Sequence, residues 1–148
     1  MRVNYKVVRS ENGRLLSAVI DIPQLCLEYQ PGKWTRAKIG GILVFTTKKA
    51  AIESLSHLNF DADLEVWSCD SRYPVKLPKY ALKFIPDINY VKALWNGKFD
   101  NPEPWEYGIW YYLYHWSSGS KAYRQVKLLK KVFSRKDYFK ELETCSNT

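Results

Sequence analysis

Three turn-forming dipeptides divide the first 45 residues into short segments, and this punctuation constrains the fold most strongly. They are Asn12-Gly13, Pro31-Gly32 and Gly40-Gly41. The segments around the first one, VNYKVVR (3–9) and LLSAVID (15–21), are rich in β-branched or alternating apolar residues, which is typical of strands. Asn-Gly accepts the positive φ angles of a tight turn, so the pair predicts an early β-hairpin. CLEYQ (26–30) and ILVFTT (42–47) are predicted to be further strands.

The clearest helix signal follows the ILVFTT strand. Thr47 is a suitable N-cap residue, and KKAAIESLSHL (48–58) carries apolar residues at helical spacing. LEVWSCD (64–70) then predicts another strand. We expect the two strands to form a core beneath the helix. The strand residues of that core are Leu43, Val44, Phe45, Leu64 and Val66, and the helix residues that cover them are Ala50, Ala51 and Leu55.

Prolines punctuate the middle of the chain, since five of the seven fall within residues 71–104. Only short elements fit between them. We predict a strand near Tyr80–Phe84 and one or two helical turns over Tyr90–Trp95. Asn96-Gly97 is expected to end these turns.

The last third of the chain leaves two segments open between strand and helix. One is the aromatic segment 105–116, and the other is the basic segment 121–132; RKDYFKEL (135–142) favours a helix. Strands first, then one central helix, then mixed elements predict the α+β class. We expect a single domain over residues 1–140, with a mixed or antiparallel sheet, the early hairpin, one central helix and a basic C-terminal helix. A loose tail is expected over 141–148.

Composition excludes several classes of protein. A hydrophobic content of 46% predicts a packed core and argues against disorder. No apolar run approaches the roughly 18 residues of a membrane span, and the first residues carry no apolar signal region. We therefore expect a soluble cytoplasmic protein without a membrane partner. The cysteines match no zinc or redox spacing, so free thiols, no metal and no cofactor are expected at Cys26, Cys69 and Cys145.

The positive charge of the chain is concentrated near its C-terminus. The whole chain carries a formal charge of +8, and residues 121–140 hold eight basic side chains and one acidic one. Local charge of this kind favours a site for an anionic partner. If the segment is a helix, its central basic residues share one face; if it is a strand, Arg124 separates from Lys127 and the patch moves to 130–140. The predicted contact residues are Arg124, Lys127, Lys130, Lys131, Arg135 and Lys136.

The nature of the anionic partner is left open by the sequence. Basic side chains beside aromatic rings are typical of proteins that hold single-stranded nucleic acid, with phosphates on the cations and bases on the rings. The candidate rings are Trp34, Trp105, Trp110 and Trp116. An acidic protein surface would fit the same charge. We expect one of these two partners, in a host cell.

One enzymatic alternative is a site similar to that of ADP-ribosyltransferases. Such a site would use Arg9 to pair with the dinucleotide phosphates and Thr46-Thr47 to hold the nicotinamide ribose. Glu103 or Glu106 would stabilise the oxocarbenium character of the transition state. The residues occur in the required order, but the chain has no Glu-x-Glu or Gln-x-Glu motif on a clear strand.

A second enzymatic alternative is a two-histidine phosphoesterase. In that chemistry one imidazole removes a proton from the attacking hydroxyl, the other protonates the leaving oxygen, and nearby hydroxyls hold the phosphate. His115-Trp116-Ser117 matches the His-x-Ser pattern, whereas Asn59 breaks it after His57. Because both enzymatic patterns are incomplete, a non-enzymatic binding protein is the favoured interpretation.

Three stretches within residues 3–70 resemble a loose group of small, uncharacterised bacterial and phage-encoded proteins. They are YKVVRSENGRLLSAV, LEYQPGKWTRAKIGGILVFTTKKAA and LEVWSCD. The shared features are a Tyr-Lys-Val opening, a Tyr-x-x-Gly-x-Trp turn, a Phe-Thr-x-x-x-Ala junction and a Glu-Val-Trp strand. The resemblance implies a phage-type accessory or inhibitor protein that acts on a component of its host.

Overall fold

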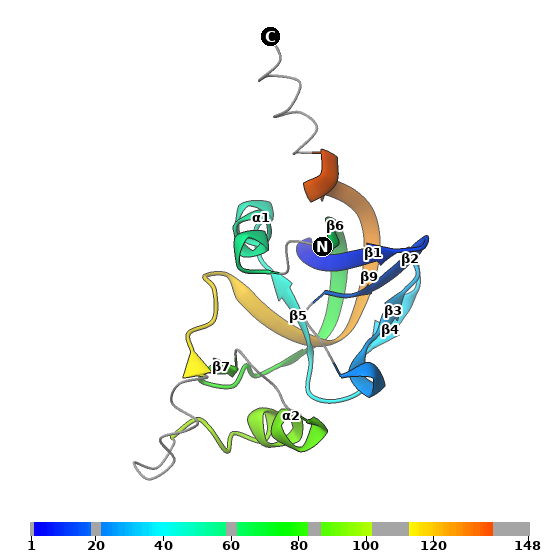
Figure 1. The fold of residues 1–148 in the computed structure, drawn as a ribbon. Coiled ribbons are helices and arrows are strands. Elements are labelled where there is room, and N and C mark those ends of the chain that lie inside the picture. The colour runs from blue at the N-terminus through cyan, green and yellow to red at the C-terminus, as the bar shows by residue number, and fades with distance from the viewer. Residues whose placement is uncertain (1, 19–21, 59–61, 83–86, 102–112, 138–148) are drawn as a thin grey trace.

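The computed structural model describes residues 2–18, 22–58, 62–82, 87–101 and 113–137 (Figure 1). These residues form a mixed α+β fold built mainly from an antiparallel sheet, as the order of elements predicts. The strands are β1 (Asn4–Glu11), β2 (Arg14–Ser17), β3 (Glu28–Tyr29), β4 (Trp34–Arg36), β5 (Ile42–Phe45), β6 (Asp63–Val75), β7 (Ala81–Leu82), β8 (Leu113–Tyr114) and β9 (Ser120–Ser134). The α-helices are α1 (Lys48–Ser54) and α2 (Ile88–Trp95), and the 3-10 helices are η1 (Pro23–Leu25) and η2 (Leu55–His57).

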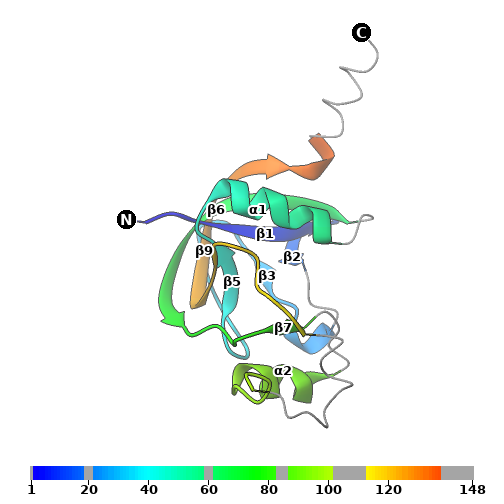
Figure 2. The same ribbon diagram turned by 90° about the vertical axis from the view of Figure 1, so that its left-hand side faces the viewer.

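Four strands close into a ring. β1 pairs with both β5 and β6, and β9 pairs with the same two strands, each time antiparallel. β2 and β3 extend the sheet from β1, while β4 extends it from β9. β6 and β9 are the longest strands, and shifts of register in their ladder after Val66 and after Ser68 let them bend along one another. In Figures 1 and 2, α1 lies at one end of this ring and α2 at the other.

The predicted hairpin is confirmed. Glu11 pairs with Arg14 across the turn, where Asn12 and Gly13 have φ angles of 52° and 77°. Two successive positive φ values twist the turn to match the right-handed twist of the strands, and Asn-Gly adopts them at low cost. β2 ends at Ser17, and the end of the predicted LLSAVID strand at 19–21 falls outside the described residues.

The hydrophobic core has two parts, because neighbouring residues of a strand face opposite sides of the sheet. Phe45, Leu64 and Val66 are buried beneath Ala51 and Leu55 of the helical segment, as predicted. Val44 is also buried, but it faces away from α1 into a second cluster drawn from all four ring strands. Leu43 is only half-buried, so its predicted place in the core is wrong. The second cluster consists of Val8, Tyr29, Ile42, Val44, Cys69, Val126 and Leu128.

Helix α1 begins where its cap was predicted. The hydroxyl of Thr47, which has an extended backbone, accepts a hydrogen bond of 3.1 Å from the amide of Ala50. Replacing Thr47 by alanine leaves that amide without this partner. The Thr47→Ala variant is therefore expected to lose about 1 kcal/mol of unfolding free energy, while Thr47→Ser retains most of it. Urea denaturation of the three proteins measures this, and equal midpoints for all three would contradict the assigned role.

Helix α2 also follows its sequence signals. The Asp87 carboxylate accepts from the amides of Asn89 and Tyr90 at its start, and Gly97, with φ of 80°, follows its last residues. The ring of Trp95 occupies the space that a Cβ atom on Gly40 would need. Gly40 thus permits α2 to pack against the loop before β5.

The structure decides for the strand in the basic segment 121–132, which the sequence leaves open between strand and helix. Residues 120–134 form a single strand, β9, held by a long ladder to β6 and by shorter ladders to β4 and β5. Residues 135–137 are helical, and the rest of the predicted C-terminal helix and the tail fall outside the described residues. Residues 105–112 of the aromatic segment also fall outside the described residues. Within the described end of that segment, Leu113 and Tyr114 form β8, which pairs with β7. β4 was not predicted, and β6 runs beyond the predicted 64–70 to include Pro74.

Candidate functional site

The middle of β9 lies between β4 on one side and β6 on the other. Trp34 of β4 pairs with Lys127, and Arg36 pairs with Gln125. On the other edge of β9, Arg72 of β6 pairs with the same Gln125. Side chains of directly paired residues lie on the same face of a sheet. Three strands therefore bring one tryptophan and three basic residues to a shared surface.

The tryptophan ring is the centre of this surface. The guanidinium carbon of Arg72 lies 3.9 Å from the centroid of the Trp34 ring, and the ammonium nitrogen of Lys127 lies 5.0 Å from it. Both distances are within the range of cation–π attraction. Arg72 is held further by a hydrogen bond from its Nε to the side-chain oxygen of Gln125. The guanidinium is thus oriented before any partner arrives.

Tyr73 adds a second, solvent-exposed aromatic ring beside Arg72. Its side chain is 58% exposed, and the Arg72 guanidinium carbon lies 5.4 Å from its ring centroid. Its backbone φ is 61°, a left-handed value that is an outlier for an aromatic residue and costs about 1 kcal/mol or more. An exposed ring held at an energetic cost is typical of a contact residue. We call the whole surface the Trp34 face, and its members are Trp34, Arg36, Arg72, Tyr73, Gln125 and Lys127.

Because the predicted basic segment is a strand, its basic side chains are distributed over both faces of the sheet. Arg124 and Lys127 are three positions apart in β9 and so point to opposite faces, as expected for the strand alternative. Lys130 is exposed, and Lys131, which is also exposed, forms an ion pair of 3.9 Å with the half-buried Glu65. Only Lys127 of the predicted contact residues belongs to the Trp34 face.

Arg135 is wrongly predicted as a surface contact. It is 8% exposed and donates a hydrogen bond to the backbone carbonyl of Ala62. Lys136, the next residue, is exposed. Arg135 thus connects the end of β9 to the segment before β6, and its charge is directed into the protein.

The residues of the transferase-like alternative are not brought together. Tyr5 pairs with Phe45, so Arg9 and Thr46 lie five residues apart along the strand direction, about 16 Å at 3.3 Å per residue. Arg9 forms an ion pair of 3.3 Å with Glu11. Glu103 and Glu106 fall outside the described residues.

The residues of the phosphoesterase alternative belong to separate elements. His115 is exposed, and its ring centroid lies 5.6 Å from that of Tyr80, beside the β7–β8 ribbon. Ser117, close to it in the chain, accepts hydrogen bonds at its backbone carbonyl from Ser120. His57 ends η2 after α1, and its side chain falls outside the described part of the chain.

Of the four candidate tryptophans, Trp34 alone is described on a basic surface. Trp105 and Trp110 fall outside the described residues. Trp116 is half-buried and donates a hydrogen bond of 2.7 Å to the carbonyl of Pro78. The signal that sequence reasoning missed is Trp34-x-Arg36, whose spacing puts both side chains on one face of a strand.

The two described cysteines, Cys26 and Cys69, carry free thiols. Across the described ranges, no group of three or more histidine, cysteine, aspartate or glutamate residues is arranged to hold a metal ion. Within the same ranges, no helix has both the length and the apolar character needed to cross a bilayer. Comparison with protein-family models, curated proteins and solved structures finds no match for this chain.

Proposed function

We propose that this chain is a non-enzymatic binding protein that holds single-stranded nucleic acid on the Trp34 face. The observation that carries the proposal is the placement of the Arg72 guanidinium near two aromatic rings, 3.9 Å from the centroid of Trp34 and 5.4 Å from that of Tyr73. Stacking on a ring leaves the in-plane N–H groups of a guanidinium available for phosphate oxygens.

The exposure of the side chains on this face indicates which of them would contact phosphates and which would contact a base. Arg36 and Arg72 are exposed and Lys127 is half-buried, so each can reach a phosphate of a strand that crosses β4, β9 and β6. Tyr73 offers a ring to an unstacked base. Bases stack on side chains in this way only when they are not paired in a duplex, which favours single strands over double strands.

The biological role that we propose rests on the resemblance of residues 3–70 to small phage and bacterial proteins. A phage-encoded binding protein would act in the cytoplasm of the host cell. By occupying single-stranded nucleic acid it would assist the phage or inhibit a host machine that needs the same strand.

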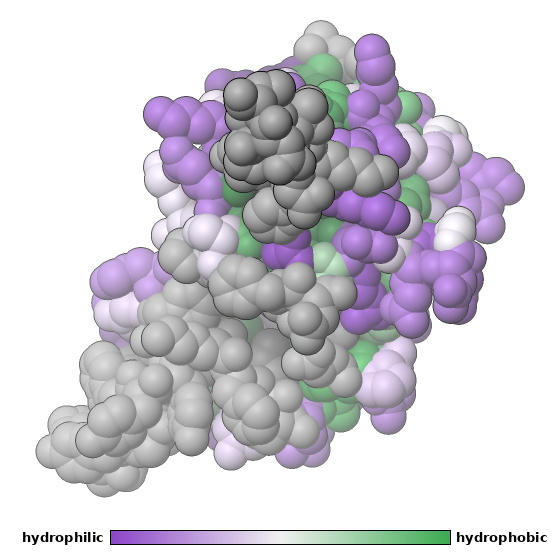
Figure 3. Space-filling view, turned by 45° about the horizontal axis from the view of Figure 1, so that its top comes forward, coloured by the Kyte–Doolittle hydropathy of each residue, from purple (hydrophilic) through white to green (hydrophobic). Residues whose placement is uncertain are grey.

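An acidic protein surface is the second candidate partner, and the far end of β9 favours it. There Leu129 is 40% exposed beside the exposed Lys130 and Lys131, and no aromatic side chain is described as exposed among residues 128–137. Figure 3, which tilts this end of the molecule forward, shows hydrophilic side chains over most of the coloured surface with smaller hydrophobic areas between them. Such a mixture suits a protein interface.

Titration of the protein with a fluorescent oligothymidylate separates these candidates. Binding to the single strand is expected to be stronger than binding to a duplex of equal length. A plot of log affinity against log salt concentration is expected to have a slope of about −2, because three cations contribute about −0.7 each on single strands.

A duplex that binds as tightly as the single strand would contradict stacking on Tyr73. Absence of oligonucleotide binding at low salt would overturn the proposal. A host protein captured equally well before and after nuclease treatment would then favour the acidic protein surface.

A further inference from the structure

One row of side chains on the Trp34 face presents hydrogen-bond donors to a partner. It consists of Arg72 of β6, Gln125 of β9 and Arg36 of β4, because Gln125 is paired with each of the two arginines. Directly paired residues share a face of the sheet, so the three side chains lie next to one another across the strands. Arginine has N–H donors and no acceptor, and the amide of Gln125 has both.

The hydrogen bond between Arg72 and Gln125 fixes how this amide is oriented. Because a guanidinium cannot accept, the group that faces Arg72 Nε at 2.5 Å must be the amide oxygen of Gln125. The NH2 group is then on the other arm of the amide, and no acceptor for it lies among the described residues. Gln125 is half-buried, so a partner at the surface can reach this donor.

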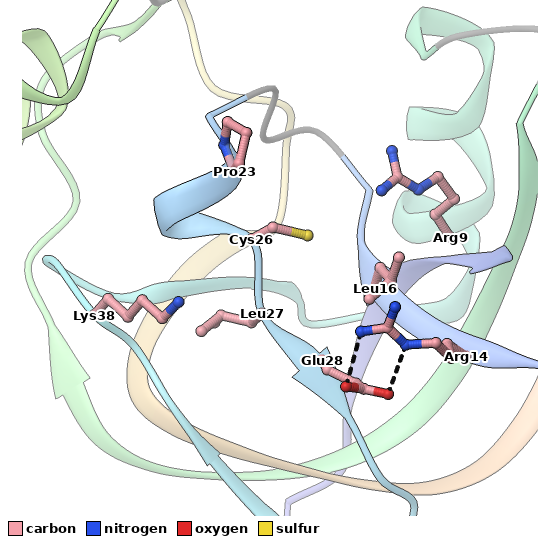
Figure 4. A pocket seen from close by; sticks show the side chains of 8 residues that line it. All are labelled: Arg9, Arg14, Leu16, Pro23, Cys26, Leu27, Glu28 and Lys38. Atoms are coloured by element: carbon pink, nitrogen blue, oxygen red, sulfur yellow. Dashed lines mark hydrogen bonds and ion pairs between the residues drawn. The ribbon is translucent and has the colours of Figure 1, made fainter.

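The two arginines of the row are not neutralised by a carboxylate in the described part of the chain. An arginine on another surface shows the contrast. In the pocket beside the β1–β2 hairpin, Arg14 donates hydrogen bonds of 3.0 and 3.1 Å to both carboxylate oxygens of Glu28 (Figure 4). The donors of Arg14 are therefore occupied, whereas the terminal N–H groups of Arg36 and Arg72 are open to a partner.

Asp70 is the acidic residue that strand pairing adds to this face. It lies opposite Lys127, in the row next to that of Arg72. Its Oδ1 atom accepts a hydrogen bond of 2.9 Å from the backbone amide of Ser71. Asp70 thus does not change the donor character of the row formed by Arg72, Gln125 and Arg36.

Guanine has the edge that complements neighbouring donors. Its O6 and N7 atoms are adjacent acceptors, whereas the same edge of adenine combines the N7 acceptor with an N6 amino donor. We propose that the Trp34 face selects guanine in a single strand, a preference that rests on the proposed function. The Gln125 NH2 group and one terminal N–H of Arg72 donate to O6 and N7, and the remaining N–H groups of Arg72 stay available for a phosphate.

Tyr73 places a base next to these two donors. Its exposed ring has its centroid 5.4 Å from the guanidinium carbon of Arg72, so a base stacked on it has an edge beside Arg72 and Gln125. Arg36 and Lys127 lie on the strands beyond and serve the phosphates on either side of the base. Adenine in this position would direct its amino group at donors, which leaves hydrogen bonds unmade.

Strands that carry a single base isolate this contact. In deoxyribose strands of about five nucleotides, every base except the central one is removed, so the phosphates remain and only one base can stack on Tyr73. In fluorescence anisotropy at low salt, the guanine strand is expected to bind about tenfold more tightly than the adenine strand. The same order is expected in ribose strands, because the edge of the base is unchanged.

Two analogues of guanine test which atoms are read, without any change to the protein. Inosine keeps O6 and N7 and lacks only the 2-amino group, so it should bind as tightly as guanine. 7-Deazaguanine lacks the N7 acceptor and should bind about fivefold more weakly, the loss of one hydrogen bond.

The Gln125→Glu variant is expected to reverse the preference. Its carboxylate still accepts from Arg72 and offers a second oxygen in place of the NH2 group, so the site then combines an acceptor with a donor, as the edge of adenine requires. The added negative charge weakens binding of all strands, and the ratio of the two affinities is therefore compared. Arg14→Gln removes an arginine outside the Trp34 face and is the control, with an unchanged ratio. Circular dichroism verifies that both variants are folded.

Equal affinities for the guanine and adenine strands would overturn guanine selection. The proposed function would then still stand, provided that oligothymidylate binds. A loss with inosine as large as that with adenine would also overturn the assignment, because it would place the contact at the 2-amino group. Absence of oligothymidylate binding would instead overturn the proposed function itself, so the two failures are distinguishable.

Discussion

Replacing Arg72 by alanine is expected to weaken binding of a single-stranded oligonucleotide about 30-fold at low salt, a loss of about 2 kcal/mol that is typical of an oriented arginine at the centre of an interface. The fold should remain intact, because Arg72 is exposed and its contacts with Trp34 contribute only about 0.5–1 kcal/mol at such a site. Fluorescence anisotropy measures the affinity, and thermal denaturation verifies the fold.

A double-mutant cycle tests whether Trp34 acts through Arg72. Trp34→Ala removes the ring on which the guanidinium lies, and is expected to cost about as much affinity as Arg72→Ala. The double variant should then bind nearly as well as the weaker single variant, since the two residues form one unit. Fully additive losses would mean that each residue contacts the oligonucleotide independently.

Lys130→Ala is the matched control for this experiment. It removes one positive charge from the same strand, β9, at a point beyond the Trp34 face. Its affinity should fall by less than about threefold, as expected for a distant charge screened by salt. A larger loss in Lys130→Ala than in Arg72→Ala would move the interface to the far end of β9 and contradict the proposed site.

Replacing Lys6 by methionine is expected to stabilise the protein at pH 7 by about 1–2 kcal/mol. Lys6 lies on β1, with its ammonium 5.9 Å from the ring centroid of buried Tyr29. Burial lowers the pKa of Lys6 from 10.5 to about 8, because the surrounding protein solvates the charged amine poorly. At pH 7 the amine is charged in both states, so folding must transfer a charge into this environment; the side chain is partly exposed, which reduces the cost.

The same shift makes stability depend on pH. Above pH 8 the folded protein loses the Lys6 proton while the unfolded chain keeps it up to about 10.5, so the free energy of unfolding should rise with pH. Burial raises the pKa of Cys69 from 9.0 to about 11, and it also raises the pKa of Tyr29. Both of these shifts lower stability at higher pH, from about pH 9 for Cys69, so the effect of Lys6 is clearest between pH 8 and 9.

Urea denaturation at pH 7, 8 and 9 measures the contribution of Lys6. The unmodified protein should gain stability between pH 8 and 9, and Lys6→Met should not. Lys49→Met, on the exposed face of α1, is the control and should follow the unmodified protein. If Lys6→Met were less stable at pH 7 and kept the rise with pH, the assignment of a costly buried charge to Lys6 would be wrong.

Local chemistry predicted several features correctly. Asn12-Gly13 forms the hairpin turn, Thr47 caps α1, and Gly97 follows the end of α2. Each of these features depends on the backbone preferences or hydrogen bonds of a few neighbouring residues. The same reasoning could not decide between strand and helix for residues 120–134, because Val126 and Leu128 fit either pattern until β6 provides a partner.

The sites were less predictable than the elements. Lys127 was identified from charge, and Trp34 from its aromatic ring, but Arg72 was missed because it lies 53 residues from Gln125 in the chain. The positive charge of its segment predicts a surface contact at Arg135, whereas the residue is buried and the backbone carbonyl of Ala62 accepts its hydrogen bond. The net charge of a segment therefore does not show which of its basic side chains face solvent, because that depends on how the strand pairs with its neighbours.

By itself, the sequence determined the turns, the helix caps, the α+β class and the concentration of positive charge, because these depend on residue type and on neighbours within a few positions. Only the tertiary structure decided that β1, β5, β9 and β6 close into a ring. The pairing of β9 with β4 on one edge and with β6 on the other brings Trp34, Arg72 and Lys127 to one surface. The physical reason is that strands bury their apolar faces and satisfy their backbone hydrogen bonds only through distant partners, so the register of those pairings sets which side chains meet.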